Sequence, residues 1–181
     1  MNNEHLSLTK KERLEYIYLL KILEKLYPEQ SEEYSQYRNA LQQGFSLHYA
    51  DMMIELSEDE LSINECRKVL DILEMYRGII YSYRALKREN TDISLTDEDV
   101  KFPGFDGNNE CYHMAYVKYF IDDLDRYSEI QELSNGYYNS HHRMLSQYEK
   151  MLEKWNEFES LPNRYLMNEE QIRELLNSKF K

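Results

Sequence analysis

Residues 63–87 read INECRKVLDILEMYRGIIYSYRALK and hold the longest helical pattern in the chain. Ser62 and Glu65 have the S-x-x-E spacing of a capping box, which favours a helix start at this point. At 100° per residue the large apolar side chains share one arc roughly 140° wide, formed by Val69, Ile72, Leu73, Tyr76, Ile79, Ile80, Tyr83 and Leu86. Because this arc is wider than a coiled-coil seam, we expect the helix to have several partners and to form the centre of the fold.

The opposite side of this helix carries small residues. Gly78, Ser82 and Ala85 follow one another at helical spacing, and Tyr81 lies beside them. A glycine inside a helix costs about 1 kcal/mol relative to alanine, and close approach of a second helix is one reason to keep it. A two-fold contact would bring this stripe against its own copy, so we predict a homo-oligomer, most simply a dimer. The alternative is that the stripe is covered by the same chain or is solvated.

The first 44 residues predict a helical hairpin. Thr9 and Glu12 form another capping box, and apolar residues then recur at helical spacing up to Pro28. A second helix starts at Ser31 and ends at Gly44, where a left-handed residue is favoured. A short helix is expected over 45–56. We therefore predict an N-terminal hairpin subdomain over 1–56, packed on a main helical domain over 57–181.

The remainder of the main domain also shows helical spacing. A polar and acidic surface loop is expected over 88–101, and Asp106 can cap a helix over 107–127. An amphipathic helix is predicted over 140–158 and ends before Pro162.

The C-terminal segment completes an all-α prediction. Asn168 and Gln171 have the spacing to cap a short terminal helix. Five glycines and three prolines are too few for the dense turns of an all-β fold. We therefore predict an all-α, multi-helix bundle.

Charge and composition exclude several classes of protein. With 22 Lys and Arg against 34 Asp and Glu, the formal charge is −12, which disfavours nucleic acid as a partner. Near the N-terminus, Lys10, Lys11 and Arg13 form the only convincing basic cluster. No stretch approaches the roughly 20 apolar residues that span a membrane, and no signal sequence is evident. Cys66 and Cys111 lack a disulfide or zinc spacing, so a cytoplasmic location is predicted.

Metal and catalytic motifs are sparse. Glu110 and His113 have the Glu-x-x-His spacing of di-iron bundles, but that architecture needs a second such motif and two more glutamates. The adjacent His141 and His142 point about 100° apart on a helix and do not face one ion. We predict no metal, no cofactor and no catalytic residue, and the sequence favours a non-enzymatic protein.

Two polar residues could nonetheless belong to a ligand pocket. His113 projects into the apolar arc of the 107–127 helix, and Asp123 lies near the directions of four tyrosines. Either residue could orient a ligand, or it could simply be hydrogen-bonded within the fold. The possible pocket comprises His113, Asp123, Tyr112, Tyr116, Tyr119 and Tyr127.

Tyrosine is unusually frequent, with 17 residues in a chain of 181. Tyrosine suits interfaces because it buries a large ring and keeps a polar group, although it also substitutes for Phe or Leu at half-exposed core positions. We therefore predict a self-associating protein-interaction module that could also bind another protein. The alternative is an enzyme or small-ligand binder that uses the possible pocket.

Several short stretches resemble the YfbU family of uncharacterised bacterial proteins, from about Glu33 onward. They are Asp71-Ile-Leu-Glu-Met-Tyr76, Phe102 with Gly104-Phe105-Asp106 and Glu110, Tyr116-Val117-Lys118, Arg126-Tyr127, and Tyr148, Met151, Leu152 and Trp155 followed by Pro162 and Tyr165. The resemblance implies an all-helical fold with a helical-hairpin portion. It implies no activity and gives no support to His113 or Asp123 as functional residues.

Overall fold

The computed structural model describes residues 6–54, 56–57, 59–89, 92–160 and 163–180. Within these ranges every regular element is helical, and the one pairing of extended backbone is a parallel bridge between Phe105 and Asn139. The all-α prediction is therefore confirmed. No helix in the described ranges is long and apolar enough to cross a bilayer. Contacts divide the chain into two compact units, Met1–Glu60 and Leu61–Lys181, whereas the predicted division into folding domains at residue 56 stays a prediction.

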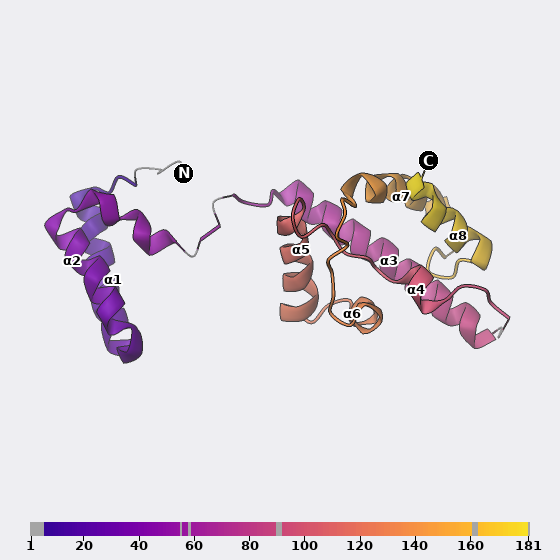
Figure 1. The fold of residues 1–181 in the computed structure, drawn as a ribbon, viewed down its shortest axis with the longest axis horizontal. Coiled ribbons are helices and arrows are strands. Elements are labelled where there is room, and N and C mark those ends of the chain that lie inside the picture. The colour runs from indigo at the N-terminus through magenta and orange to yellow at the C-terminus, as the bar shows by residue number, and fades with distance from the viewer. Residues whose placement is uncertain (1–5, 55, 58, 90–91, 161–162, 181) are drawn as a thin grey trace. The chain divides into compact units, whose positions relative to one another are not determined.

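The N-terminal unit consists of two helices followed by 3₁₀ turns (Figure 1). Its elements are α1 (Lys10–Leu26), η1 (Pro28–Gln30), α2 (Ser31–Gln43), η2 (Ser46–His48) and η3 (Ala50–Met53). The predicted Thr9–Glu12 capping box is present, and Gly44 ends α2 in the left-handed region with φ 78°. The short helix expected over 45–56 is instead a pair of 3₁₀ turns.

The helices α1 and α2 pack against each other over a small core. Leu20, Leu41 and Tyr49 are its buried members. Arg13 of α1 donates from Nη1 to the Leu41 carbonyl at 3.1 Å, and the Arg38 guanidinium pairs with the Glu24 carboxylate. Only one apolar residue of α1 is buried, so much of that helix stays outside the core.

The C-terminal unit is organised around α3, as predicted (Figure 1). The helix α3 (Ile63–Glu89) contacts each of the following α-helices of the unit. These are α4 (Asp97–Val100), α5 (Cys111–Lys118), α6 (Ser128–Ser134), α7 (Leu145–Glu157) and α8 (Glu169–Asn177). The predicted wide apolar arc is buried, because Val69, Leu73 and Ile80 are inaccessible to solvent.

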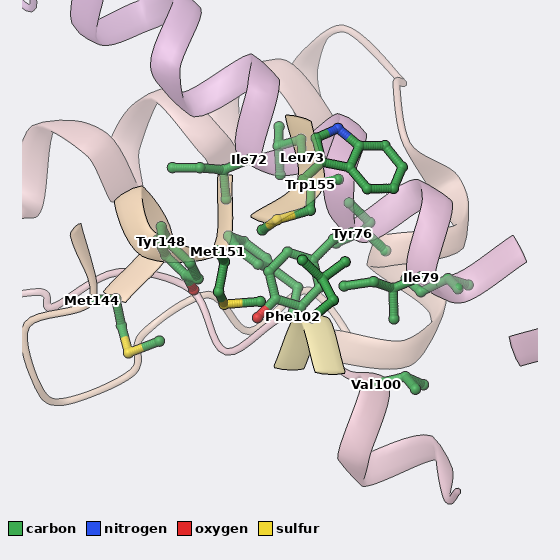
Figure 2. Close-up of a cluster of buried hydrophobic side chains, with 14 of the residues drawn as sticks. Ile72, Leu73, Tyr76, Ile79, Val100, Phe102, Met144, Tyr148, Met151 and Trp155 are labelled. Atoms are coloured by element: carbon green, nitrogen blue, oxygen red, sulfur yellow. The ribbon is translucent and has the colours of Figure 1, made fainter. Parts of the chain in front are cut away.

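Aromatic rings fill the centre of this unit (Figure 2). Tyr76 of α3 makes edge contacts with Phe102 and Tyr148, with centroid distances of 5.0 and 5.9 Å. Tyr148 comes from α7 and donates its hydroxyl to the Gly104 carbonyl at 2.7 Å. The loop around Phe102 is therefore fixed to α3 and α7 from inside the core.

The segment 88–101 differs from the predicted surface loop, although residues 90 and 91 lie outside the described ranges. It contains α4, which Thr96 caps together with Asp99. Leu95 and Val100 on either side of this cap are buried in the core. The expectation of a surface loop is wrong here, because these two apolar residues anchor the segment to α3.

The predicted helices over 107–127 and 140–158 both begin too early. Helix α5 starts at Cys111, because the Asp106 carboxylate accepts from the Asn108 N–H and forms a turn first. It continues into η4 (Tyr119–Asp123), which is one turn of π-helix. Helix α7 starts at Leu145, after His141 adopts a left-handed φ of 59°. The stop predicted at Pro162 lies outside the described residues.

Candidate functional site

His113 is partly buried and packs against the core. Its Nε2 lies 2.9 Å from Oε2 of Glu65 on α3, and its ring tilts against Phe105 with a centroid distance of 5.4 Å. The hydrogen bond from His113 lowers the pKa of the Glu65 carboxyl, and Lys68 lowers it further. Of the two roles weighed for His113, the geometry favours a partly buried residue with a hydrogen-bonded ring.

Asp123 lies at the end of η4 and is exposed to solvent. It is ten positions after His113, which corresponds to roughly 15 Å along a helix axis. Neither residue lines any of the three main cavities of the described structure. His113 and Asp123 therefore lie in different surroundings, one hydrogen-bonded to Glu65 of α3 and the other at the surface.

The four tyrosines of the predicted pocket occupy different surroundings. Tyr112 and Tyr119 are exposed, whereas the Tyr116 ring tilts against Tyr119 and Phe120 at 6.3 and 6.1 Å. Tyr127 is partly buried and lies under the Arg77 guanidinium, 3.8 Å from the ring centroid. The four rings therefore do not share one environment, and Tyr127 takes part in the contacts between α3 and α6.

A buried ion pair accounts for the position of Tyr127. Its hydroxyl donates to Glu74 of α3 at 2.8 Å, and Arg77 in turn donates from Nε to Glu129 at 2.6 Å. The Glu129 side chain is buried, so its charge requires this partner. These contacts fix α6 to α3, so their role is structural.

The buried tyrosines predict a loss of stability at alkaline pH. Burial raises the pKa of Tyr76, Tyr148 and Tyr138, and the hydrogen bond to Asp122 raises that of Tyr138 further. Because the folded-state pKa exceeds the unfolded value, their contribution is complete below about pH 10 and is lost as pH rises above it. Urea unfolding monitored by circular dichroism should show a falling free energy of unfolding above about pH 10. Tyr138→Phe should make that fall shallower, and a profile that stays flat above pH 10 would contradict the assignment.

The small-residue stripe on α3 is covered by the chain itself. A Cβ atom at Gly78 would lie 2.3 Å from Cη2 of Trp155 on α7, so glycine makes room for this indole. Ser82 is buried one turn later, where its Oγ donates to the Gly78 carbonyl at 2.7 Å and accepts from the Met167 N–H at 2.9 Å. Gly78 and Ser82 are thus unavailable to a second copy, which corrects their prediction as interface residues. Tyr81 and Ala85 remain accessible and line a surface groove.

Gly78→Ala should lower the free energy of unfolding by up to about 2 kcal/mol, although alanine favours helices. The methyl group displaces the Trp155 ring, and overpacking of this kind costs about 1–3 kcal/mol against a propensity gain of about 1. Denaturant unfolding measures the effect. In a Trp155→Phe background the same change should be less harmful, because the smaller ring leaves space. A stabilising effect of Gly78→Ala in the wild-type background would refute this explanation.

The N-terminal unit presents an apolar surface that sequence analysis did not single out. Four side chains at i, i+4 spacing run along α1 and are largely exposed, and we name them the α1 ridge: Leu14 (50% exposed), Tyr18 (57%), Ile22 (54%) and Leu26 (65%). The signal was present in the sequence, because the apolar residues of α1 spread over more of the helix than one partner covers. Surface apolar residues that form a continuous row mark interaction sites more often than scattered ones.

Comparison with known proteins covers both units. The YfbU domain model matches residues 6–178, so the match begins well before Glu33 and includes α1 and the α1 ridge. The UPF0304 protein MJECS11 of Methanocaldococcus jannaschii is 34% identical over 174 residues, which are 94% of this chain and 99% of that protein. The family match extends over nearly the whole chain, and the relative has almost the same length. The chain therefore belongs to the YfbU family.

Proposed function

We propose that this protein is a self-associating protein-interaction module and that the α1 ridge is its contact surface. The observation that carries the proposal is the exposure of four large apolar side chains in one row on a helix. Leu19 is also exposed on α1 and widens the row. Burying such side chains is the main favourable term in protein association.

A second copy of the chain is the occupant that the ridge fits best. A row of residues at i±4 spacing is one of the ridges by which helices pack, and two such rows interdigitate when helices cross at about −50°. A two-fold axis through the middle of the row, between Tyr18 and Ile22, would place the same row on both partners. Tyr18 and Ile22 would then form the centre of the contact, with Leu14 and Leu26 at its ends.

The apolar area is sufficient for a modest dimer. The four ridge side chains and Leu19 leave about half of their surface exposed, which amounts to roughly 500 Å² per copy. Two copies would bury about 1,000 Å² in total, which is close to the lower limit for a specific interface. We therefore expect a dimer that dissociates at low micromolar concentrations and depends on the central pair of side chains.

The test is sedimentation equilibrium of the wild type and of Ile22→Lys at tens of micromolar. The wild type should be dimeric, and the lysine at the centre of the contact should weaken dimerisation by about a hundredfold. The matched control is Tyr16→Lys, which alters another exposed aromatic residue of α1 outside the ridge. It should leave dimerisation unchanged.

Three results would decide against the proposal. A monomeric wild type at tens of micromolar would refute self-association. Equal effects of Ile22→Lys and Tyr16→Lys would place the contact elsewhere, as would an Ile22→Lys dimer of wild-type affinity. Circular dichroism of both variants establishes that the helices remain folded.

We also propose that the protein is located in the cytoplasm. Cys66 and Cys111 form no disulfide, which fits a reducing compartment.

The alternative of a ligand pocket around His113 and Asp123 receives less support, because His113 is bonded to Glu65 and Asp123 lies at the surface.

A further inference from the structure

A groove of about 730 Å³ lies in the C-terminal unit beside the second half of α3. Four of its lining residues are at positions i, i+3, i+4 and i+7 of this helix, so they share one face: Tyr81, Arg84, Ala85 and Arg88. The segment 163–166 forms the opposite wall through Tyr165 and Leu166. The volume falls within the range of small-molecule sites and greatly exceeds that of a bare inorganic anion.

The charge of this groove is opposite to that of the protein. Arg84, Lys87 and Arg88 line it, and none of its described lining residues carries a carboxylate, although the chain carries a formal charge of −12. Arg84 pairs through Nη2 with Glu132 at 2.6 Å, and Lys87 pairs with Asp97 at 3.1 Å. These two partners neutralise part of the charge at the rim of the groove.

Of the three cations that line the groove, Arg88 is the one without an ion pair among the described residues. Its Nε donates to the Arg84 carbonyl at 3.2 Å, which orients the guanidinium, and it has no ion pair with any residue that the structure describes. A planar guanidinium with unused N–H donors recognises phosphate and carboxylate groups in a bidentate manner. An anionic group of a ligand would therefore bind at the Arg88 end of the groove.

The other end of the groove suits a flat ring. Tyr81 is exposed there, and Leu166 is an exposed apolar residue on the opposite wall. The Tyr165 hydroxyl donates to Glu74 and its ring makes an edge contact with Trp155, so this wall is held in place. Ala85 between Tyr81 and Arg88 leaves room for a ligand that spans both ends.

We propose that this groove binds a nucleoside monophosphate, with the phosphate on Arg88 and Arg84 and the base against Tyr81 and Leu166. The two negative charges of the phosphate would pair with the guanidinium of Arg88. The base would pack its ring against Tyr81 and Leu166, which we call the aromatic wall. This site is independent of the α1 ridge, because every lining residue belongs to the C-terminal unit.

The test is isothermal titration of the full chain with adenosine monophosphate, inorganic phosphate and adenosine as separate probes. The expected Kd for the monophosphate is on the order of 0.1 mM, with each of the other two probes at least tenfold weaker. Arg88→Gln and Tyr81→Ala should each weaken binding of the monophosphate by about tenfold. Arg67→Gln is the matched control, because it removes an exposed arginine from the other end of α3 and should not alter binding.

Each other outcome overturns a part of the proposal. No saturable binding of the monophosphate at millimolar concentration removes the site altogether. Binding that survives both Arg88→Gln and Tyr81→Ala places the ligand elsewhere. Inorganic phosphate that binds as tightly as the monophosphate removes the role of the aromatic wall. Dimerisation through the α1 ridge is measured separately and is unaffected by any of these results.

Discussion

Gly104→Ala is expected to lower the free energy of unfolding of the C-terminal unit by about 4 kcal/mol or more. A Cβ atom at this position would lie 1.9 Å from the carbonyl oxygen and 2.1 Å from the carbonyl carbon of Tyr138. The obstacle is backbone, so no side chain can rotate away. Gly104 also has a φ of 87°, which strains any residue with a Cβ atom.

The cost is large because the segment that follows this glycine pairs side by side with the segment 138–140. The Phe105 N–H donates to the Tyr138 carbonyl at 2.9 Å, and the Ser140 N–H donates to the Phe105 carbonyl at 3.0 Å. Tyr148 bonds the Gly104 carbonyl from the core. Separating the segments to accommodate a methyl group would break these hydrogen bonds and displace Phe105 from the aromatic cluster.

Gly136→Ala provides the control for this prediction. Gly136 also has a positive φ, 69°, but nothing lies within 4 Å of a Cβ atom built there. It should therefore cost only about 1 kcal/mol, the conformational part of the effect. Urea unfolding followed by the fluorescence of the single tryptophan, Trp155, reports on the C-terminal unit. Equal losses of unfolding free energy at the two glycines would show that the close contact between Gly104 and Tyr138 does not explain the effect.

Local signals in the sequence accounted for the starts of four helices, α1, α2, α3 and α8. The capping boxes at Thr9 and Asn168 and the left-handed glycine at 44 were predicted from residue type and spacing and are present in the structure. The buried arc of α3 followed in the same way from a 3.6-residue period. Such features depend on residues three or four apart, so a sequence contains the information needed to predict them.

Features that depend on tertiary contacts were missed. Helix α6 lies between Tyr127 and Asn135, two non-glycine residues with φ of 53° and 52°, and no local pattern marks those positions as helix ends. His113 was correctly placed toward the interior, but its partner Glu65 is 48 residues away in the chain. Gly78 was correctly read as a close-approach site, whereas the group that approaches is Trp155 of the same chain. Spacing alone does not identify a distant partner.

Glu110→Ala is expected to cost about 4 kcal/mol, because this carboxylate accepts hydrogen bonds from three backbone N–H groups in two separate segments. Its Oε1 accepts from the Leu145 N–H at 2.8 Å, and both of its oxygens accept from the Met144 N–H, at 2.9 and 3.0 Å. Oε2 also accepts from the Asp106 N–H at 3.0 Å. Met144 and Leu145 begin α7, so a side chain at the start of α5 caps another helix and places a negative charge at its positive end. The carboxylate is buried, and its loss leaves two buried N–H groups and one half-buried N–H group without this partner.

Glu110→Gln separates the charge from the shape of this side chain. Glutamine has nearly the same volume, but its amide nitrogen would face an N–H donor at a site where both oxygens of the glutamate accept. We expect a loss of about 2 kcal/mol, intermediate between wild type and alanine, because one oxygen still accepts.

Glu153→Ala is the control, since this exposed glutamate of α7 has the same charge and should change the free energy of unfolding by less than about 0.5 kcal/mol. Thermal unfolding of the three variants measures the series. If the glutamine variant were as stable as the wild type, the charge at the start of α7 would contribute nothing. If the alanine variant were equally stable, the three N–H groups would have found other partners, and Glu110 would not be the residue that joins α5 to α7.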